Sequence, residues 1–258
     1  MRPFPFLIAA LILFSVGCVQ HHYSPNFIQT PYLDKKGDIM LTAAVSGSPV
    51  SLNGDFHASY SPLKYGTVML NYFRTSTSFE DANVFGGTTY SQTTKGYLVE
   101  GALGGYLPVS FGTGALYVGW GQGQMRNDFG IGRIADLRLQ RFFVQPTFTF
   151  KNDWFRLGMG LRVVRLNFPT GSIDYRIEPG DIEKIQRLEK ESPFWFPEMG
   201  GNIGVHFKPV TISASLVIVG AQPASEYGFD ASNIGLGISL ELNELFKKQD
   251  RKPVNEER

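Results

Sequence analysis

Apolar and polar residues alternate along most of this chain from Asp38 onward, with a period of two. In residues 39–46 the larger apolar side chains occupy the odd positions, and in residues 233–242 they occupy the even positions. Similar runs begin near Leu52, Tyr65, Lys95, Gly114, Ala135, Trp154, Phe196 and Val210. A period of two is typical of β-strands whose two faces meet different surroundings. The pattern therefore predicts an all-β domain of about ten strands, within a range of roughly 8–12.

The lengths of the runs and of their connections indicate a membrane barrel. Most runs have about 9–14 residues, whereas strands of soluble proteins usually have about 5–6 and membrane-barrel strands need about 9–11. Long connections at 75–94, 124–133, 169–195 and 221–231 alternate with short turns at 109–113, 151–153 and 208–209. Bacterial outer-membrane barrels show this alternation. We therefore predict a closed antiparallel up-and-down β-barrel over residues 38–243, with both of its ends on the short-turn, periplasmic side.

The longest connection contains a stretch with a helical period. Ile182, Ile185 and Leu188 share one face, and Asp181 precedes them as a candidate N-cap. We predict a short helix there, which lies as a lid or rim over one end of the barrel. Residues 244–258 are rich in charge and are expected to form a solvated tail.

The sixth run contains a change of phase. Leu137 and Leu139 place apolar side chains on odd positions, whereas from Phe142 to Phe150 the apolar side chains fall mainly on even positions. A β-bulge inserts one extra residue into a strand and would produce such a shift. The sequence therefore predicts a bulge near Arg141.

The N-terminal residues have the pattern of an export signal. Residues 1–17 begin with a basic residue, continue with an apolar run from Phe4 to Phe14, and end on small residues. This run is shorter than the roughly 20 apolar residues of a membrane-spanning helix. Cys18 is the only cysteine of the chain and follows directly. We predict a signal peptide over 1–17, a diacylglycerol or acyl lipid on Cys18, and a solvated tether over 18–37; an ordinary signal peptide with an incidental cysteine is the alternative.

The alternation leaves open which face points outward, and the polar positions help to decide. They carry charges mixed with many glycines, which suits a narrow, hydrogen-bonded lumen surrounded by a lipid-facing exterior. The expected lumen residues are Asp55, Asn71, Glu100, Gln122, Arg156, Arg162, Asn202 and Glu241. Two interpretations follow. Glu100, Arg156 and Arg162 act as selectivity groups of a polar pathway, or Asp55, Glu100, Arg156, Arg162 and Glu241 form a polar network that plugs the lumen, because buried charges must be paired.

Charge and motifs exclude several classes of function. The chain has 24 Lys and Arg against 23 Asp and Glu, so it lacks the basic field that attracts nucleic acid. It contains no Gly-x-Ser-x-Gly elbow, Walker loop or Cys/His metal spacing. His21 and His22 fall in the predicted tether, and His57 and His206 are expected near the periplasmic end of the lumen. We therefore expect neither catalysis nor a cofactor or metal ion, beyond the lipid on Cys18.

Some short segments suggest a family resemblance. Ser15–Cys18 resembles the bacterial lipobox, although Ser15 stands where Leu is most common. Together with Tyr23-Ser24-Pro25-Asn26 and the succession of hairpins, it is similar to a group of small lipid-anchored outer-membrane β-barrel proteins. The resemblance implies a fold and an outer-membrane location, and it implies no activity. The even strand count predicts that both chain ends lie in the periplasm.

Three hypotheses for the function follow from this reading. The first is a structural or accessory role in an outer-membrane assembly, with membrane lipids and other outer-membrane or periplasmic proteins as partners. The second is a small channel or transporter for polar solutes. The third is a lipid-tethered periplasmic barrel that carries an apolar ligand, which requires the apolar face of the strands to point inward.

Overall fold

Ten antiparallel strands close into a single barrel. The computed structural model describes residues 22–48, 51–81, 90–174, 176–220 and 227–247. The barrel strands are β1 Ile39–Gly47, β2 Ser51–Tyr60, β3 Gly66–Asp81, β4 Tyr90–Val109, β5 Gly112–Asp128, β6 Ile134–Lys151, β7 Phe155–Asn167, β9 Phe194–Phe207, β10 Val210–Val219 and β11 Ser232–Glu241. Each strand pairs with its neighbour in the chain, and β1 pairs with β11 to close the ring. The predicted all-β up-and-down barrel is confirmed.

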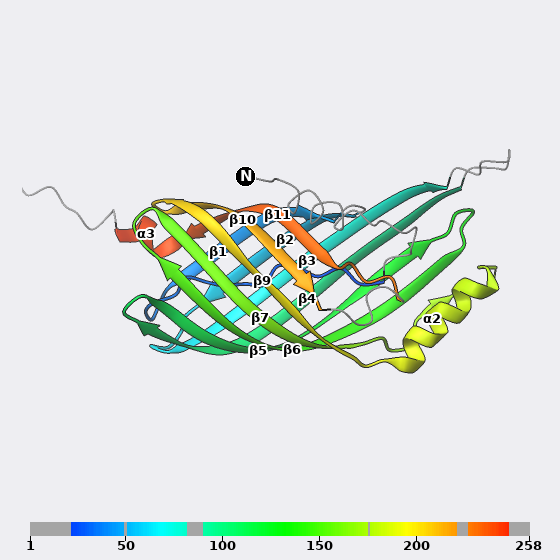
Figure 1. Cartoon of the computed structure of the whole chain (residues 1–258), viewed down its shortest axis with the longest axis horizontal. Helices are drawn as coiled ribbons and strands as arrows, with labels where there is room; N and C mark the ends of the chain where they lie inside the picture. Colours follow the sequence, from blue (N-terminus) through cyan, green and yellow to red (C-terminus); the bar gives the residue numbers. More distant parts are fainter. Residues whose placement is uncertain (1–21, 49–50, 82–89, 175, 221–226, 248–258) are drawn as a thin grey trace, which may run out of the picture.

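The two ends of the barrel differ (Figure 1). One end carries the short turns and the helix α3 Leu242–Lys247, and the other carries the long connections, the two-residue strand β8 Ser172–Ile173 and the helix α2 Pro179–Glu191. We call them the short-turn end and the long-loop end. Strands β3, β4 and β5 extend well into the predicted loops 75–94 and 124–133, so these loops were predicted too long. In this part of β3, Thr75 and Thr77 face inward whereas Arg74 and Ser76 face outward. The strand therefore continues with polar side chains on both faces, and no apolar alternation predicts it.

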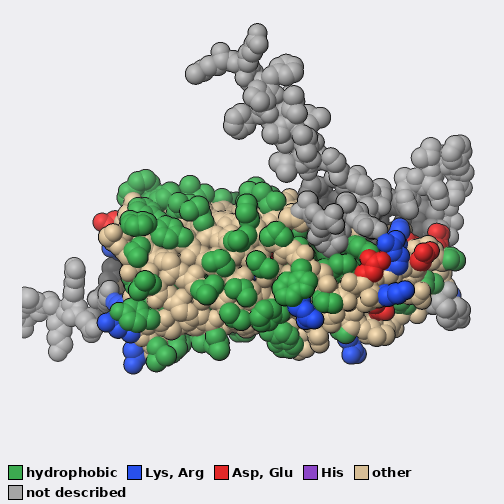
Figure 2. All heavy atoms as spheres, turned by 60° about the horizontal axis from the view of Figure 1, so that its bottom comes forward, with side chains coloured by type: hydrophobic (Ala, Val, Ile, Leu, Met, Phe, Trp, Pro, Cys, Tyr) green, Lys and Arg blue, Asp and Glu red, His purple; other side chains and the backbone are tan. Residues whose placement is uncertain are grey.

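The apolar face of the strands points outward. Every barrel strand places at least one large apolar side chain on the exterior. Figure 2 shows apolar side chains spread over much of one face of the barrel. Examples around the ring are Val45, Leu52, Leu70, Leu103, Leu116, Phe142, Met159, Ile203, Ile212 and Leu236. The inward positions of the same strands carry mostly polar or small side chains. This arrangement matches the lipid-facing exterior that we predicted.

Strand β6 has no bulge, and the predicted bulge near Arg141 is wrong. Its register with β5 is continuous from Thr149 to Ile134, and odd-numbered side chains face inward throughout. The apolar pattern changes phase because the surroundings change along the strand. Leu137 and Leu139 face an apolar cluster inside the long-loop end, whereas Phe142 lies in the exterior apolar belt. Arg141 consequently points into the lumen.

The predicted helix in the longest connection is present as α2. It begins at Pro179 after Glu178, so Asp181 lies in its first turn and is not the N-cap. Ile185 and Leu188 are buried in the apolar cluster at the long-loop end, so α2 packs against that end of the barrel. Neither α2 nor α3, the helices of the described residues, is long and apolar enough to cross a bilayer.

Candidate functional site

The most unusual feature of the barrel is the chain segment inside it. Residues 22–33, which we call the luminal segment, are all buried, and the dark-blue trace runs along the barrel interior in Figure 1. This differs from the solvated tether that we predicted for 18–37. His22 in particular is buried, and its Nδ1 atom lies 2.7 Å from the carbonyl oxygen of Tyr227. Cys18 and His21 lie outside the described residues.

The luminal segment passes from one end of the barrel to the other. Tyr23 pairs with Phe229 in the β10–β11 connection at the long-loop end. At the other end Asp34, just after the segment, forms an ion pair with Lys151 beside the β6–β7 turn. The barrel itself begins and ends at the short-turn end, as predicted, and Asn243 of α3 donates a hydrogen bond to Asp38 there. The first and last described residues, His22 and Lys247, therefore lie at opposite ends of the barrel, and the chain ends themselves lie outside the described residues.

An ion pair between Arg141 and Glu100 binds the part of the luminal segment that is nearer to the long-loop end. Both side chains are fully buried, and Nε and Nη2 of Arg141 donate to the two carboxylate oxygens of Glu100 at 2.6 and 2.5 Å. Nη1 and Nη2 also donate to the hydroxyl of Tyr23 and to Oδ1 of Asn26. The guanidinium group thus joins β6, β4 and the luminal segment.

A second buried pair completes this network. Nε of Arg162 on β7 donates to Glu198 on β9 at 2.5 Å, and Nη2 donates to the carbonyl oxygen of Asn26 at 2.9 Å. The hydroxyl of Tyr23 donates to the other carboxylate oxygen of Glu198. We call the four charged residues with Tyr23 and Asn26 the charged network. Each charge has an opposite partner, which is the condition for tolerating ions in a site without bulk water.

The predicted lumen residues separate into three groups. Glu100 and Arg162 belong to the charged network, and Asn71 donates to Glu100 at 3.4 Å. Asp55 instead accepts hydrogen bonds from the backbone N–H of Phe27 and from Ser46. Arg156 and Glu241 form a separate pair at the short-turn end, with Nε to Oε1 at 3.0 Å. The lumen interpretation that invoked internal salt bridges is therefore the one that the geometry favours.

Asn202 and Gln122 were also predicted to face the lumen. Asn202 faces inward and bonds to Tyr32 and Thr30 of the luminal segment. Gln122 is exposed on the outer face of β5, so its assignment to the lumen was wrong. Gln122 shares its parity with Trp120, which faces outward. The sequence analysis missed Arg141 and Glu198. It placed a bulge at Arg141, and it did not use the fact that Glu198, next to Pro197, has the same parity as Asn202, which was predicted to face the lumen.

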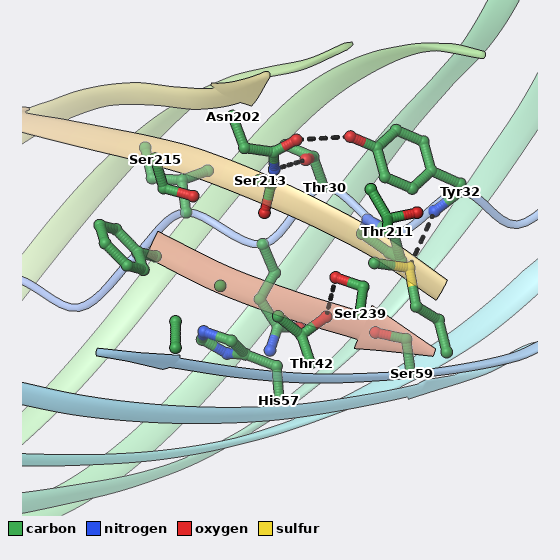
Figure 3. Close-up of a pocket in the computed structure, with 17 residues that line it drawn as sticks. Thr30, Tyr32, Thr42, His57, Ser59, Asn202, Thr211, Ser213, Ser215 and Ser239 are labelled. Atoms are coloured by element: carbon green, nitrogen blue, oxygen red, sulfur yellow. Dashed lines mark hydrogen bonds between the residues drawn. The ribbon is translucent and has the colours of Figure 1, made fainter. Parts of the chain in front are cut away.

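The opposite wall of the lumen is lined by small hydroxyl side chains. Between this wall and the luminal segment lies a cavity of about 40 Å³ (Figure 3). Its polar lining includes Thr30, Thr42, His57, Ser59, Asn202, Thr211, Ser213, Ser215 and Ser239. A buried water needs roughly 10–15 Å³ of such space, so the cavity has room for about three waters. A larger cavity of about 200 Å³, the vestibule, lies at the short-turn end and shares Tyr32 and Met40 with the first.

Hydrogen bonds also fasten the long-loop end. The hydroxyl of Tyr227 donates to the carboxylate of Glu191 at the end of α2, and this bond lowers the pKa of Glu191. Arg176 donates side-chain and backbone hydrogen bonds to Asp174, which lowers the pKa of Asp174 to about 2. Both carboxylates therefore remain charged at neutral pH and keep these loop contacts.

No protein-family model matches the chain, and a comparison with curated proteins finds no match. Among solved structures, the fold is similar to that of CdiB from Acinetobacter baumannii, with 10% sequence identity and a TM-score of 0.25. The similarity covers 80% of this chain and 60% of the CdiB chain, so the chain spans less than two thirds of CdiB.

Proposed function

We propose that this protein is an integral outer-membrane β-barrel that is sealed by its own N-terminal segment and has a structural or accessory role. The observation that carries the proposal is the combination of an apolar exterior on all ten strands with a filled polar lumen. Soluble monomers rarely expose a large continuous apolar surface. A lipid bilayer accepts such a surface, and a closed barrel leaves no unpaired strand edge within it.

The filled lumen favours an accessory role over open conduction. The luminal segment occupies the barrel from Tyr23 to Leu33. Hydrogen bonds of the charged network join the part of this segment near the long-loop end to four strands. A solute that crosses the barrel must displace these contacts. We therefore propose that the protein contributes its surfaces rather than a permanent pore, without catalysis or a bound organic cofactor, and that membrane lipids and other envelope proteins are its partners.

The channel hypothesis remains the second candidate because of one observation. The cavity beside Ser213 and Ser239 and the vestibule at the short-turn end form a polar region along one wall. This region would provide a path for small polar solutes if the luminal segment moved. By contrast, an apolar-ligand carrier needs its apolar face inside, and the described strands place that face outside.

Membrane integration predicts that the barrel stays in the membrane without any lipid on the chain. A Cys18→Ala variant with a replacement signal peptide is expected to remain in the membrane fraction after carbonate and urea extraction, because the exterior belt itself is embedded. The wild-type chain serves as the control. Release of the variant into the soluble fraction would show that the lipid is the anchor and would contradict the proposal.

The path of the luminal segment predicts that the two chain ends appear on different sides of the membrane. Long loops of outer-membrane barrels face the cell exterior, and His22 lies at the long-loop end. Only three residues lie between Cys18 and His22, and an extended chain spans at most about 3.6 Å per residue. The residues just before His22 are therefore expected at the cell surface, and a lipid on Cys18 would lie in the outer leaflet.

Antibody labelling of intact cells tests this orientation. An epitope inserted after Gln20 is expected to be labelled on intact cells, whereas an epitope placed after Arg258 is expected to be labelled only after the outer membrane is opened. The second insertion is the matched control for expression and for cell integrity. Labelling of the Arg258 epitope alone on intact cells would reverse the orientation that we propose.

A further inference from the structure

Three side chains that can bind a metal ion meet at the short-turn end. His206 is on β9, Glu241 is the last residue of β11, and Glu244 is on α3. Their ligand atoms, one ring nitrogen and one oxygen from each carboxylate, all lie within 4.8 Å of one another. The side chain of His206 is fully buried, and those of Glu241 and Glu244 are 12% and 24% exposed. The strands and α3 therefore hold the three groups around one point.

We propose that His206, Glu241 and Glu244 bind a divalent transition-metal ion of the zinc type, with water completing the coordination. A set of one imidazole and two carboxylates suits zinc, whereas magnesium and calcium prefer oxygen ligands alone. Nε2 of His206 and Oε2 of Glu244 are 3.1 Å apart. This separation is close to that of two ligands that share one ion at about 2.0–2.2 Å.

The surroundings of His206 resemble those of a metal ligand. Its Nδ1 atom lies 2.8 Å from Oγ1 of Thr211. When Nδ1–H donates to this oxygen, Nε2 carries the lone pair and faces Glu244. Metal-bound histidines usually donate their second ring N–H to such a partner, which fixes the tautomer. Arg156 holds Oε1 of Glu241 at 3.0 Å and orients that carboxylate in the same way.

The site is open to solvent and has a favourable charge. Glu241 and Glu244 line the vestibule of about 200 Å³, which gives an ion access and leaves room for water ligands. The two carboxylates outnumber the single guanidinium of Arg156, so the cluster is negative before a cation binds. Because the ligands come from two strands and a helix, a bound ion would fasten α3 to the barrel wall. A charged His206 paired with Glu244 is the alternative that the test must exclude.

Titration calorimetry of the tag-free, detergent-solubilised protein with ZnCl2 tests the proposal. We expect one binding event that is absent with MgCl2. Loss of a residue that hydrogen-bonds to a metal ligand typically weakens metal binding by roughly 10- to 100-fold. His206→Ala and Glu244→Gln remove the ligands themselves, so each is expected to weaken zinc binding by more than that. Thr211→Val removes such a partner, and we expect it to weaken binding by about 10- to 100-fold. Glu183→Gln on exposed α2 is the carboxylate control and should bind as the wild type does.

Folding and protection of α3 provide independent readouts. Each variant is accepted only if the unheated barrel keeps its compact mobility in SDS gels, and Glu244→Gln is the milder change if His206→Ala does not fold. Zinc is expected to slow proteolysis at α3 in the wild type and not in Glu244→Gln. Equal zinc affinity in the wild type and both ligand variants, or no binding by the wild type, would overturn the proposal and leave an ion pair only.

Discussion

Replacing Arg141 with methionine is expected to destabilise the barrel by about 3–5 kcal/mol, because removal of one partner leaves the other charge of a buried ion pair uncompensated. Arg141 is fully buried and donates to Glu100, Tyr23 and Asn26. Methionine would fill most of its space but would leave the carboxylate of Glu100 in the lumen without its main partner. Guanidinium unfolding of the detergent-solubilised protein, followed by tryptophan fluorescence, measures the change in the free energy of unfolding.

A second arginine provides the matched control. Arg126 pairs with Asp136 at 3.7 Å near the long-loop end, but its side chain is 54% exposed. Exposed pairs contribute only about 0–1 kcal/mol, so Arg126→Met should change stability by no more than that. Adding Glu100→Gln to Arg141→Met should recover much of the loss, because it removes the unpaired charge. Equal and small effects at Arg141 and Arg126 would show that water reaches the charged network.

The barrel could be predicted from the sequence because its apolar exterior and its polar lumen select opposite residue types at alternate positions. Ile234, Leu236 and Ile238 alternate with small or polar residues and face outward as that pattern requires. The pattern fails where these surroundings change. Toward the long-loop end the exterior of β6 carries the exposed polar residues Arg138 and Gln140, and its interior faces an apolar cluster. The phase therefore reverses at Arg141 without any insertion. A continuous strand that passes between two environments therefore shows the same change of phase in its apolar pattern as a bulged strand in a single environment.

The candidate site could be predicted only in part. Glu100 and Arg162 lie on strands, where parity assigns them to the lumen, and the structure places both there. The luminal segment has no period, since it bonds to side chains from several strands rather than to one partner strand. The sequence therefore assigned it to the solvated tether, including Tyr23–Asn26, whose side chains bind the charged network. The convergence of His206 with Glu244 likewise depends on where α3 begins, which residue spacing does not reveal.

Emptying the lumen is expected to convert a silent barrel into a conducting one. The wild-type protein in planar bilayers should show no steady openings, because residues 22–33 fill the lumen. A glycine–serine linker of equal length in place of these residues removes the side chains that occupy the space. The remaining path would run along the wall of Thr211, Ser213 and Ser239, where the side chains are small and hydroxylated. Stable single-channel steps should therefore appear.

The barrel is expected to survive this replacement because its charges still pair with one another. Arg141 keeps Glu100, and Arg162 keeps Glu198, so the linker leaves both ion pairs of the charged network in place. A compact band in unheated SDS gels verifies folding before conductance is measured. A milder variant, Tyr23→Ala with Asn26→Ala, removes the side-chain contacts of the segment with the charged network and the packing of Tyr23 on Phe196 and Phe229. It should give brief, intermittent openings. A folded linker variant that stays silent would mean that the strands' own side chains close the lumen, and the channel hypothesis would then lose its structural basis.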